Sequence, residues 1–239
     1  AEEARFVYGS YTGYALTILN LPSGLLATLG VSVIPLAAGA AERGDTLRIR
    51  SVTARGLSVA AAAGTLFSVL LFCFGKEALY ILFKNTNSAD MLRLAAPSVL
   101  FICIMQLGGA VLQSVGHIGR AFAASAAAAV IKIIFTVILV PIPGINIYGA
   151  VIGSDIGALA GAVINLVNIS RYTGLKREYT GIIIIPAAAA AAALAALGPV
   201  RMIFGSLENI FFRTAAEGAA VALVFAAVFC IFGGMKNIR

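Results

Sequence analysis

The chain has 239 residues, of which 61% are hydrophobic and only 11% are charged, and its mean hydropathy is +1.00. A soluble domain carries about a quarter charged residues, so this composition excludes an ordinary soluble protein. The net charge of +7 does not indicate nucleic-acid binding, because no basic run is interleaved with aromatic residues. Cys73, Cys103 and Cys230 lie in apolar stretches without metal-site spacing, so we expect no metal and no cofactor.

Seven apolar segments are long enough to cross a bilayer, which requires about 20 predominantly apolar residues. In chain order they are Tyr11–Ala38, Val52–Phe74, Met91–Val115, Phe122–Val140, Ile147–Ile169, Gly181–Leu197 and Thr214–Phe232. Lipid offers no partner for an unpaired backbone N–H or C=O, so each segment is expected to be a helix. The sequence predicts an all-α, polytopic transmembrane helix bundle with seven spans in the cell (cytoplasmic) membrane.

Basic residues gather in alternate connectors between these spans. The richer connectors carry Arg43, Arg48, Arg50 and Arg55, then His117 and Arg120, then Arg171, Lys176 and Arg177, and finally Lys236 and Arg239. The loop after the second span departs from this pattern, because Lys76, Lys84 and Arg93 flank it. By the positive-inside rule the arginine-rich side is cytoplasmic, which places the N-terminal end outside and the C-terminal end inside.

The first three spans carry polar residues and prolines. In the first span, Pro22 and Pro35 each remove a backbone donor. This predicts either tolerated kinks or a water-filled cavity lined by Asn20, Ser23 and the freed carbonyls. After the second span, the short amphipathic stretch Ala78–Phe83 is expected to lie along the outer surface.

The fourth and fifth spans are joined by only Pro141–Asn146, so they must be antiparallel neighbours. Lys132 lies eight residues before the end of one span, and Asp155 lies eight residues after the start of the next. At 1.5 Å per residue, both sit about 12 Å below the outer surface. Charges at this depth face protein or a wet cavity and often mark transport routes. Three interpretations stay open: a static ion pair, a functional pair, or a Lys132 that faces the cavity to meet an anion.

The fifth span also carries a glycine at every fourth position: Gly149, Gly153, Gly157 and Gly161. Such spacing produces one face without side chains, against which a neighbouring helix packs closely. Asp155 is rotated about 200° from Gly153, so the packed face and the charged face differ.

The order of several short motifs resembles the polysaccharide flippase (multidrug/oligosaccharidyl-lipid/polysaccharide exporter) superfamily. The motifs are Tyr11–Ala15 with Asn20–Ser23, Val33–Leu36, Ala41–Asp45 with Ile49–Arg50, Leu92–Pro97, Val111–Gly116, Ile131–Ile133 and Ile147–Ala150. Within this superfamily the sequence is most similar to the stage V sporulation protein B and lipid II flippase branch. The resemblance covers about Tyr8 to Gly174, and the last two spans match only in hydropathy.

The resemblance implies about fourteen helices, arranged as two lobes of six and an appended pair, around a central cavity. This chain would begin near the eighth helix, as the C-terminal half of such a protein. Residues 1–174 would form the second lobe without its first helix, and residues 175–239 would form the appended pair. The implied partners are membrane lipid, a lipid-linked anionic glycan, and either the missing N-terminal lobe or a second chain.

The implied activity is that of a flippase, not an enzyme: a lipid-linked oligosaccharide or peptidoglycan precursor crosses the membrane by alternating access, in cell-wall synthesis or sporulation. Lys132 and Arg93 are the candidate anion contacts, and Asp155 is a candidate for ion coupling. The candidate polar lining consists of Asn20, Gln106 and Gln113.

Three other classes of protein are weighed against the flippase. A multidrug and toxin extruder of the same fold needs an acidic, aromatic cavity, whereas the spans carry only Asp155 and Glu217 as acids and the chain has no Trp. A membrane enzyme needs a catalytic cluster, and no paired histidines or metal spacing occur. A non-transporting assembly protein has no use for buried charges and proline kinks.

Overall fold

The computed structural model describes residues 6, 8–173, 179–205 and 207–232, and every regular element in these ranges is helical. The elements are the π-helix η1 (Tyr11–Ala15) and the α-helices α2 (Leu16–Glu42), α3 (Thr46–Phe83), α4 (Ala89–Ala95), α5 (Ser98–Ser114), α6 (Ile118–Leu139), α7 (Tyr148–Thr173), α8 (Tyr179–Phe204) and α9 (Ile210–Ile231). Six helical stretches are long and apolar enough to cross a membrane, and the bent pair α4–α5 raises the number to seven. The predicted polytopic helix bundle is therefore confirmed for the described residues.

Two boundaries differ from the prediction. The third expected span, Met91–Val115, is not one straight helix: α4 and α5 meet at an angle of 46° around Ala96 and Pro97. Pro97 lacks a backbone N–H and its ring crowds the preceding turn, which explains a break at this position. The expected surface stretch Ala78–Phe83 is instead the last part of the 38-residue helix α3. The prolines Pro22 and Pro35 are both contained within α2, which continues through them.

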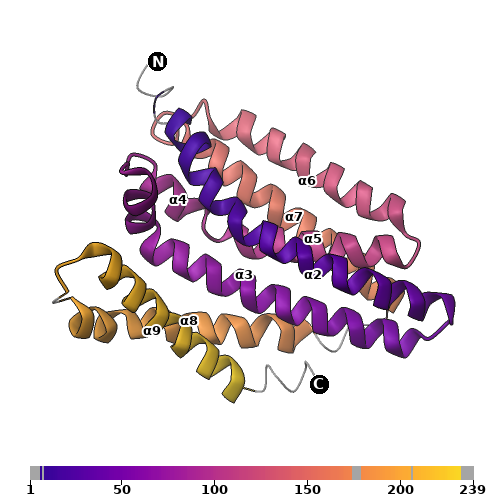
Figure 1. The fold of residues 1–239 in the computed structure, drawn as a ribbon. Helices are drawn as coiled ribbons and strands as arrows, with labels where there is room; N and C mark the ends of the chain where they lie inside the picture. The colour runs from indigo at the N-terminus through magenta and orange to yellow at the C-terminus, as the bar shows by residue number, and fades with distance from the viewer. Residues whose placement is uncertain (1–5, 7, 174–178, 206, 233–239) are drawn as a thin grey trace.

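The connectors predicted to be extracellular gather at one end of the bundle. Figure 1 shows the start of α2, the end of α3, helix α4 and the α6–α7 connection near the end marked N, while the α2–α3 turn lies at the opposite end. This agrees with an alternating topology. The absolute orientation stays a prediction, and four of the cations that support it, Lys176, Arg177, Lys236 and Arg239, lie outside the described residues.

The glycine face of α7 packs against the backbone of α6. A Cβ atom added at Gly149 would lie 2.7 Å from the carbonyl carbon of Leu139, and one at Gly157 would lie 2.8 Å from the carbonyl oxygen of Ala128. At Gly161 it would lie 2.9 Å from the Cβ of the same alanine. Real side-chain carbons do not approach this closely, so the absence of side chains allows the two helices to meet.

Helices α8 and α9 pack against each other and against α3, along the side of the bundle away from α6 (Figure 1). Their apolar cluster joins Val69 and Phe74 of α3 to Ala189, Ala193 and Val221. The arrangement is compatible with an appended helix pair. The division into residues 1–174 and 175–239 stays a prediction, since its boundary lies outside the described residues.

One buried amide joins α7 to α5. Asn165 is fully buried, and its Nδ2 donates a hydrogen bond to the backbone carbonyl of Met105 at 2.8 Å. Its Cβ lies 2.9 Å from the position that a Cβ at Gly108 would take, so the helices are close at this point. Hydrogen bonds between membrane helices stabilise a fold by about 0.6 kcal/mol on average, and by more where no alternative partner exists.

We therefore expect Asn165→Ala to lower the free energy of unfolding by roughly 1 kcal/mol, through the lost hydrogen bond and the small cavity that remains. Reversible unfolding of the full-length protein in mixed micelles measures this change. Asn168→Ala is the matched control, because Asn168 lies on the same helix and is only partly buried. Equal losses in the two variants would contradict a specific role for the Asn165 bond.

Candidate functional site

A cavity of about 440 Å³ lies among η1, α2, α5, α6 and α7. Its apolar lining comes from residues such as Leu16, Leu19, Ile102 and Met105. Its polar lining consists of Tyr11, Asn20, Ser98, Ser125, Lys132, Ser154 and Asp155. Three residues predicted from the sequence, Asn20, Lys132 and Asp155, are thus brought together from three different helices.

Lys132 and Asp155 lie at the same level of the bundle. The Lys132 carbonyl oxygen lies 3.1 Å from the position of a Cβ at Gly153, and the Lys132 Cβ lies 2.8 Å from that of a Cβ at Gly157. Asp155 lies midway between these glycines on α7. The close packing of the glycine face on α6 therefore fixes the relative height of the two charged residues.

The two charges are not paired with each other in this structure. Asp155 Oδ1 is buried and has no hydrogen-bond partner, and within the described residues neither charge takes part in an ion pair. A buried carboxylate oxygen without a partner is unfavourable by about 1–3 kcal/mol, and by more when it is charged. This arrangement differs from a static ion pair and leaves Lys132 available to the cavity.

Two serine hydroxyls of the cavity, on α6 and α7, donate within their own helices. Ser125 Oγ donates to the Ala121 carbonyl at 3.2 Å, and Ser154 Oγ donates to the Ala150 carbonyl at 2.9 Å. Their oxygen lone pairs remain able to accept hydrogen bonds. Lys132 is the one cation among the residues described around this cavity, so it is the group that can attract an anion there.

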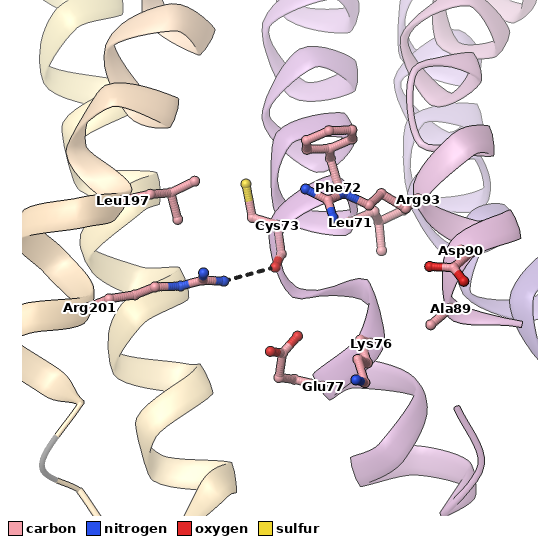
Figure 2. A pocket seen from close by; sticks show the side chains of 10 residues that line it. All are labelled: Leu71, Phe72, Cys73, Lys76, Glu77, Ala89, Asp90, Arg93, Leu197 and Arg201. Atoms are coloured by element: carbon pink, nitrogen blue, oxygen red, sulfur yellow. Dashed lines mark hydrogen bonds between the residues drawn. The ribbon is translucent and has the colours of Figure 1, made fainter. Parts of the chain in front are cut away.

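The other candidate residues lie elsewhere. Gln106 and Gln113 are exposed on α5 and do not belong to the lining of this cavity. Arg93 lies on α4 and lines a second cavity of about 220 Å³, between α3, α4 and α8. Figure 2 shows that cavity, in which Arg93 approaches from the α4 side and Arg201 from the α8 side. The structure therefore separates the two proposed anion contacts, Lys132 and Arg93.

Several lining residues were not predicted from the sequence. Tyr11, Ser98, Ser125 and Ser154 are common types in membrane helices, and only their rotational position brings them to the cavity. For Ser154 the sequence did contain a signal of a position near the cavity, because this residue directly precedes Asp155. Among the residues that the structure describes, Cys73, Cys103 and Cys230 are free, and no group of three or more His, Cys, Asp or Glu side chains is placed to hold a metal ion.

Comparisons with known proteins place this arrangement in a family. The chain is 24% identical over 164 residues to "Stage V sporulation protein B" of Bacillus subtilis (strain 168), an alignment that covers 69% of the chain and 32% of that protein. It is also 25% identical over 228 residues to "Uncharacterized membrane protein YabM" of the same organism, covering 95% of the chain and 41% of that protein. The chain thus spans well under half the length of these curated relatives. No solved structure matches it significantly.

The sequence model of the MatE family matches residues 10–138, which extend from the start of η1 through nearly all of α6. This match covers more than half of the chain and includes four of the five elements that line the larger cavity. The chain is a multi-pass membrane protein that belongs to the MatE family.

Proposed function

We propose that this chain is part of a membrane transporter of the flippase type, which moves a lipid-linked, negatively charged glycan across the cytoplasmic membrane. The observation that carries the proposal is the cavity that holds Lys132 and Asp155, unpaired, at one level among five helical elements. Ionisable groups at such depth are unfavourable in lipid and usually belong to a substrate or ion route. Family membership and the similarity to "Stage V sporulation protein B" support the same class.

The cavity lining supports a substrate of this chemistry. A lipid-linked precursor presents pyrophosphate and sugar, which need a polar route, whereas its hydrocarbon tail remains in the bilayer. Lys132 supplies a cation for the pyrophosphate, and Asn20, Ser125 and Ser154 supply hydrogen-bonding groups for sugar hydroxyls. Asp155 is the candidate group for coupling to an ion. Peptidoglycan or another oligosaccharide precursor fits this description.

Transport requires that the cavity open alternately to the two sides of the membrane. The cavity described here forms one part of the transport route. A further lobe or a second chain would supply the remaining wall of that route. Two elements of the cavity wall carry or adjoin prolines that remove backbone hydrogen bonds: α2 contains Pro22 and Pro35, and α5 begins directly after the bend at Pro97. We place the movement that opens the cavity at these elements.

The runner-up function is export of organic cations by a transporter of the same fold. The carboxylate of Asp155 favours it, because its Oδ1 has no hydrogen-bond partner and a carboxylate attracts a cation. Lys132 in the same cavity opposes it, since its ammonium repels a cationic drug. The balance therefore favours an anionic substrate.

A transport assay of the full-length protein in proteoliposomes separates these functions. We expect translocation of a fluorescent lipid-linked pyrophosphate oligosaccharide above the rate in protein-free vesicles, and no transport of ethidium. Ethidium transport without lipid translocation would assign the protein to drug export. Transport of neither substrate by protein of verified fold would overturn the flippase proposal and favour a membrane assembly role.

A further inference from the structure

The smaller cavity, at the end of the bundle that carries α4, gathers an unusual number of charges. Its volume is about 220 Å³, and it lies between the last third of α3, helix α4 and the C-terminal part of α8. Five charged residues line it: Lys76, Glu77, Asp90, Arg93 and Arg201. Three cations and two carboxylates thus surround one small space, which shares no lining residue with the cavity assigned to transport.

The two arginines reach the same segment of α3 from two neighbouring helices, Arg93 from α4 and Arg201 from α8. The Arg201 guanidinium donates a hydrogen bond from Nη2 to the Cys73 carbonyl at 3.5 Å. The Arg93 guanidinium lies over the Phe72 ring, 4.5 Å from its centroid. Figure 2 shows Arg201 reaching α3 from the α8 side and the Arg93 guanidinium beside the Phe72 ring in front of α3, with Glu77 and Lys76 one turn further along the helix. Weak contacts orient both arginines while leaving most of their N–H donors unused.

The charges of this cavity do not neutralise one another. Within the described part of the chain, none of the five side chains forms an ion pair, although they line one space. Opposite charges on a free surface gain little from pairing, so the lack of pairs alone is unremarkable. Its consequence here is that phosphate-binding donors and carboxylate acceptors both remain available to a ligand.

The positions of its charged residues at the ends of apolar segments indicate that the cavity lies at the level of lipid headgroups. Lys76 is the first charged residue after the apolar segment Val52–Phe74, and Arg201 lies three residues before the end of α8. Charged side chains at the ends of membrane helices reach the interface, where phosphate groups of lipids reside. The flanking Phe72, Leu71 and Leu197 provide apolar contact for the first part of a lipid tail. A lipid can enter from the side, because α8 contacts only α3 and α9 among the larger helix contacts.

We propose that this cavity binds the headgroup of a zwitterionic phospholipid that carries a phosphodiester and a primary ammonium. Lys76, Arg93 and Arg201 receive the phosphate, for which guanidinium groups offer paired donors. Glu77 and Asp90 receive the ammonium, which donates up to three hydrogen bonds. A bound lipid would fasten α8 to α3 and α4, so the site joins the appended pair to the rest of the bundle.

Lipid retention by the full-length protein tests this site. The purified protein is incubated in detergent micelles with equal amounts of phosphatidylethanolamine, phosphatidylcholine and phosphatidylglycerol, and bound lipid is counted by native mass spectrometry. We expect several-fold more phosphatidylethanolamine than either other lipid. Phosphatidylcholine shares the phosphate but has no N–H donors, and phosphatidylglycerol lacks the ammonium. Equal retention of all three lipids, or preference for phosphatidylglycerol, would overturn the proposal.

Substitutions test which side chains bind the phosphate of the headgroup and which bind its ammonium. Arg93→Gln with Arg201→Gln is expected to lower retention of phosphatidylethanolamine several-fold, whereas Glu77→Gln with Asp90→Asn is expected to remove the preference over phosphatidylcholine. Arg120→Gln is the matched control, because Arg120 also lies over an aromatic ring, that of Tyr172, but does not line this cavity. Loss of retention in the control, or no loss in the arginine pair, would contradict the assignment.

The alternative occupant of this cavity is a soluble ligand that carries the same phosphate and ammonium groups. Addition of free phosphoethanolamine should leave the bound lipid in place, because it lacks the acyl chains that contact Phe72 and Leu197. Displacement of the lipid by low concentrations of free phosphoethanolamine would contradict a lipid site. Circular dichroism of each variant separates loss of binding from loss of fold.

Discussion

Gly157→Leu is expected to prevent stable folding of the full-length protein. A Cβ atom at this position would lie 2.8 Å from both the Ala128 carbonyl oxygen and the Lys132 Cβ, and a leucine adds three further carbons. Overpacking of a core usually destabilises by about 1–3 kcal/mol, and here the neighbour is helix backbone, which cannot move aside as a side chain can. The loss should therefore lie at or above the upper end of that range. Fluorescence-detected size exclusion and thermal unfolding of solubilised protein measure it.

Gly119→Leu is the matched control for this effect. Gly119 lies on α6, and nothing outside its own turn of helix lies within 4 Å of a Cβ added there. The control should elute as a monodisperse peak with an unchanged melting temperature. If Gly157→Leu behaves like Gly119→Leu, the two helices are not in the close contact that the structure describes.

Removal of either cavity charge is expected to abolish most transport while the protein stays folded. Lys132→Gln removes the only cation that the structure describes in the cavity, and Asp155→Asn removes the carboxylate whose Oδ1 has no hydrogen-bond partner. We expect each to lower the rate of lipid-linked glycan translocation by about tenfold or more, which corresponds to about 1.4 kcal/mol of lost stabilisation along the transport path. Initial rates in proteoliposomes, normalised to reconstituted protein, provide the measurement.

The charge-swapped double variant distinguishes a working pair from a structural one. If the two charges only hold α6 to α7, then Lys132→Asp combined with Asp155→Lys should restore transport. If Lys132 meets the anionic substrate, the double variant should remain inactive, and this is the result we expect. Gln113→Ala is the control, since Gln113 is exposed on α5 outside the cavity lining. Full transport by both single variants would eliminate Lys132 and Asp155 from the route.

The features that the sequence predicted well depend on local rules. Span length follows from bilayer thickness, and the antiparallel α6–α7 hairpin follows from a connector too short for any other arrangement. The equal height of Lys132 and Asp155 follows from counting residues from that connector, and their contacts with the backbone around Gly153 and Gly157 agree with the count. Each of these inferences needs only the rise of a helix and the position of a turn.

The features that were missed depend on rotation and on tertiary contacts. Gln106 and Gln113 have the composition of cavity residues, but the packing of α5 turns both away from the cavity. Arg93 has the positive charge that an anion contact needs. The bend before α5, however, places Arg93 in the smaller cavity beside α8 and separates it from Lys132. Pro97 was a visible signal for that bend. The small cavity joins segments more than a hundred residues apart, so no local pattern could reveal it.

Photo-crosslinking tests most directly whether the larger cavity is the substrate route. A benzophenone amino acid replaces Ala129, which lines the cavity, or Ile134, which is exposed on the same helix but does not line it. Full-length protein in proteoliposomes is then irradiated with a radiolabelled lipid-linked pyrophosphate oligosaccharide. We predict labelling from position 129 that excess unlabelled substrate suppresses, and little labelling from position 134. Equal labelling at both positions, or specific labelling only at position 134, would contradict a substrate route through this cavity.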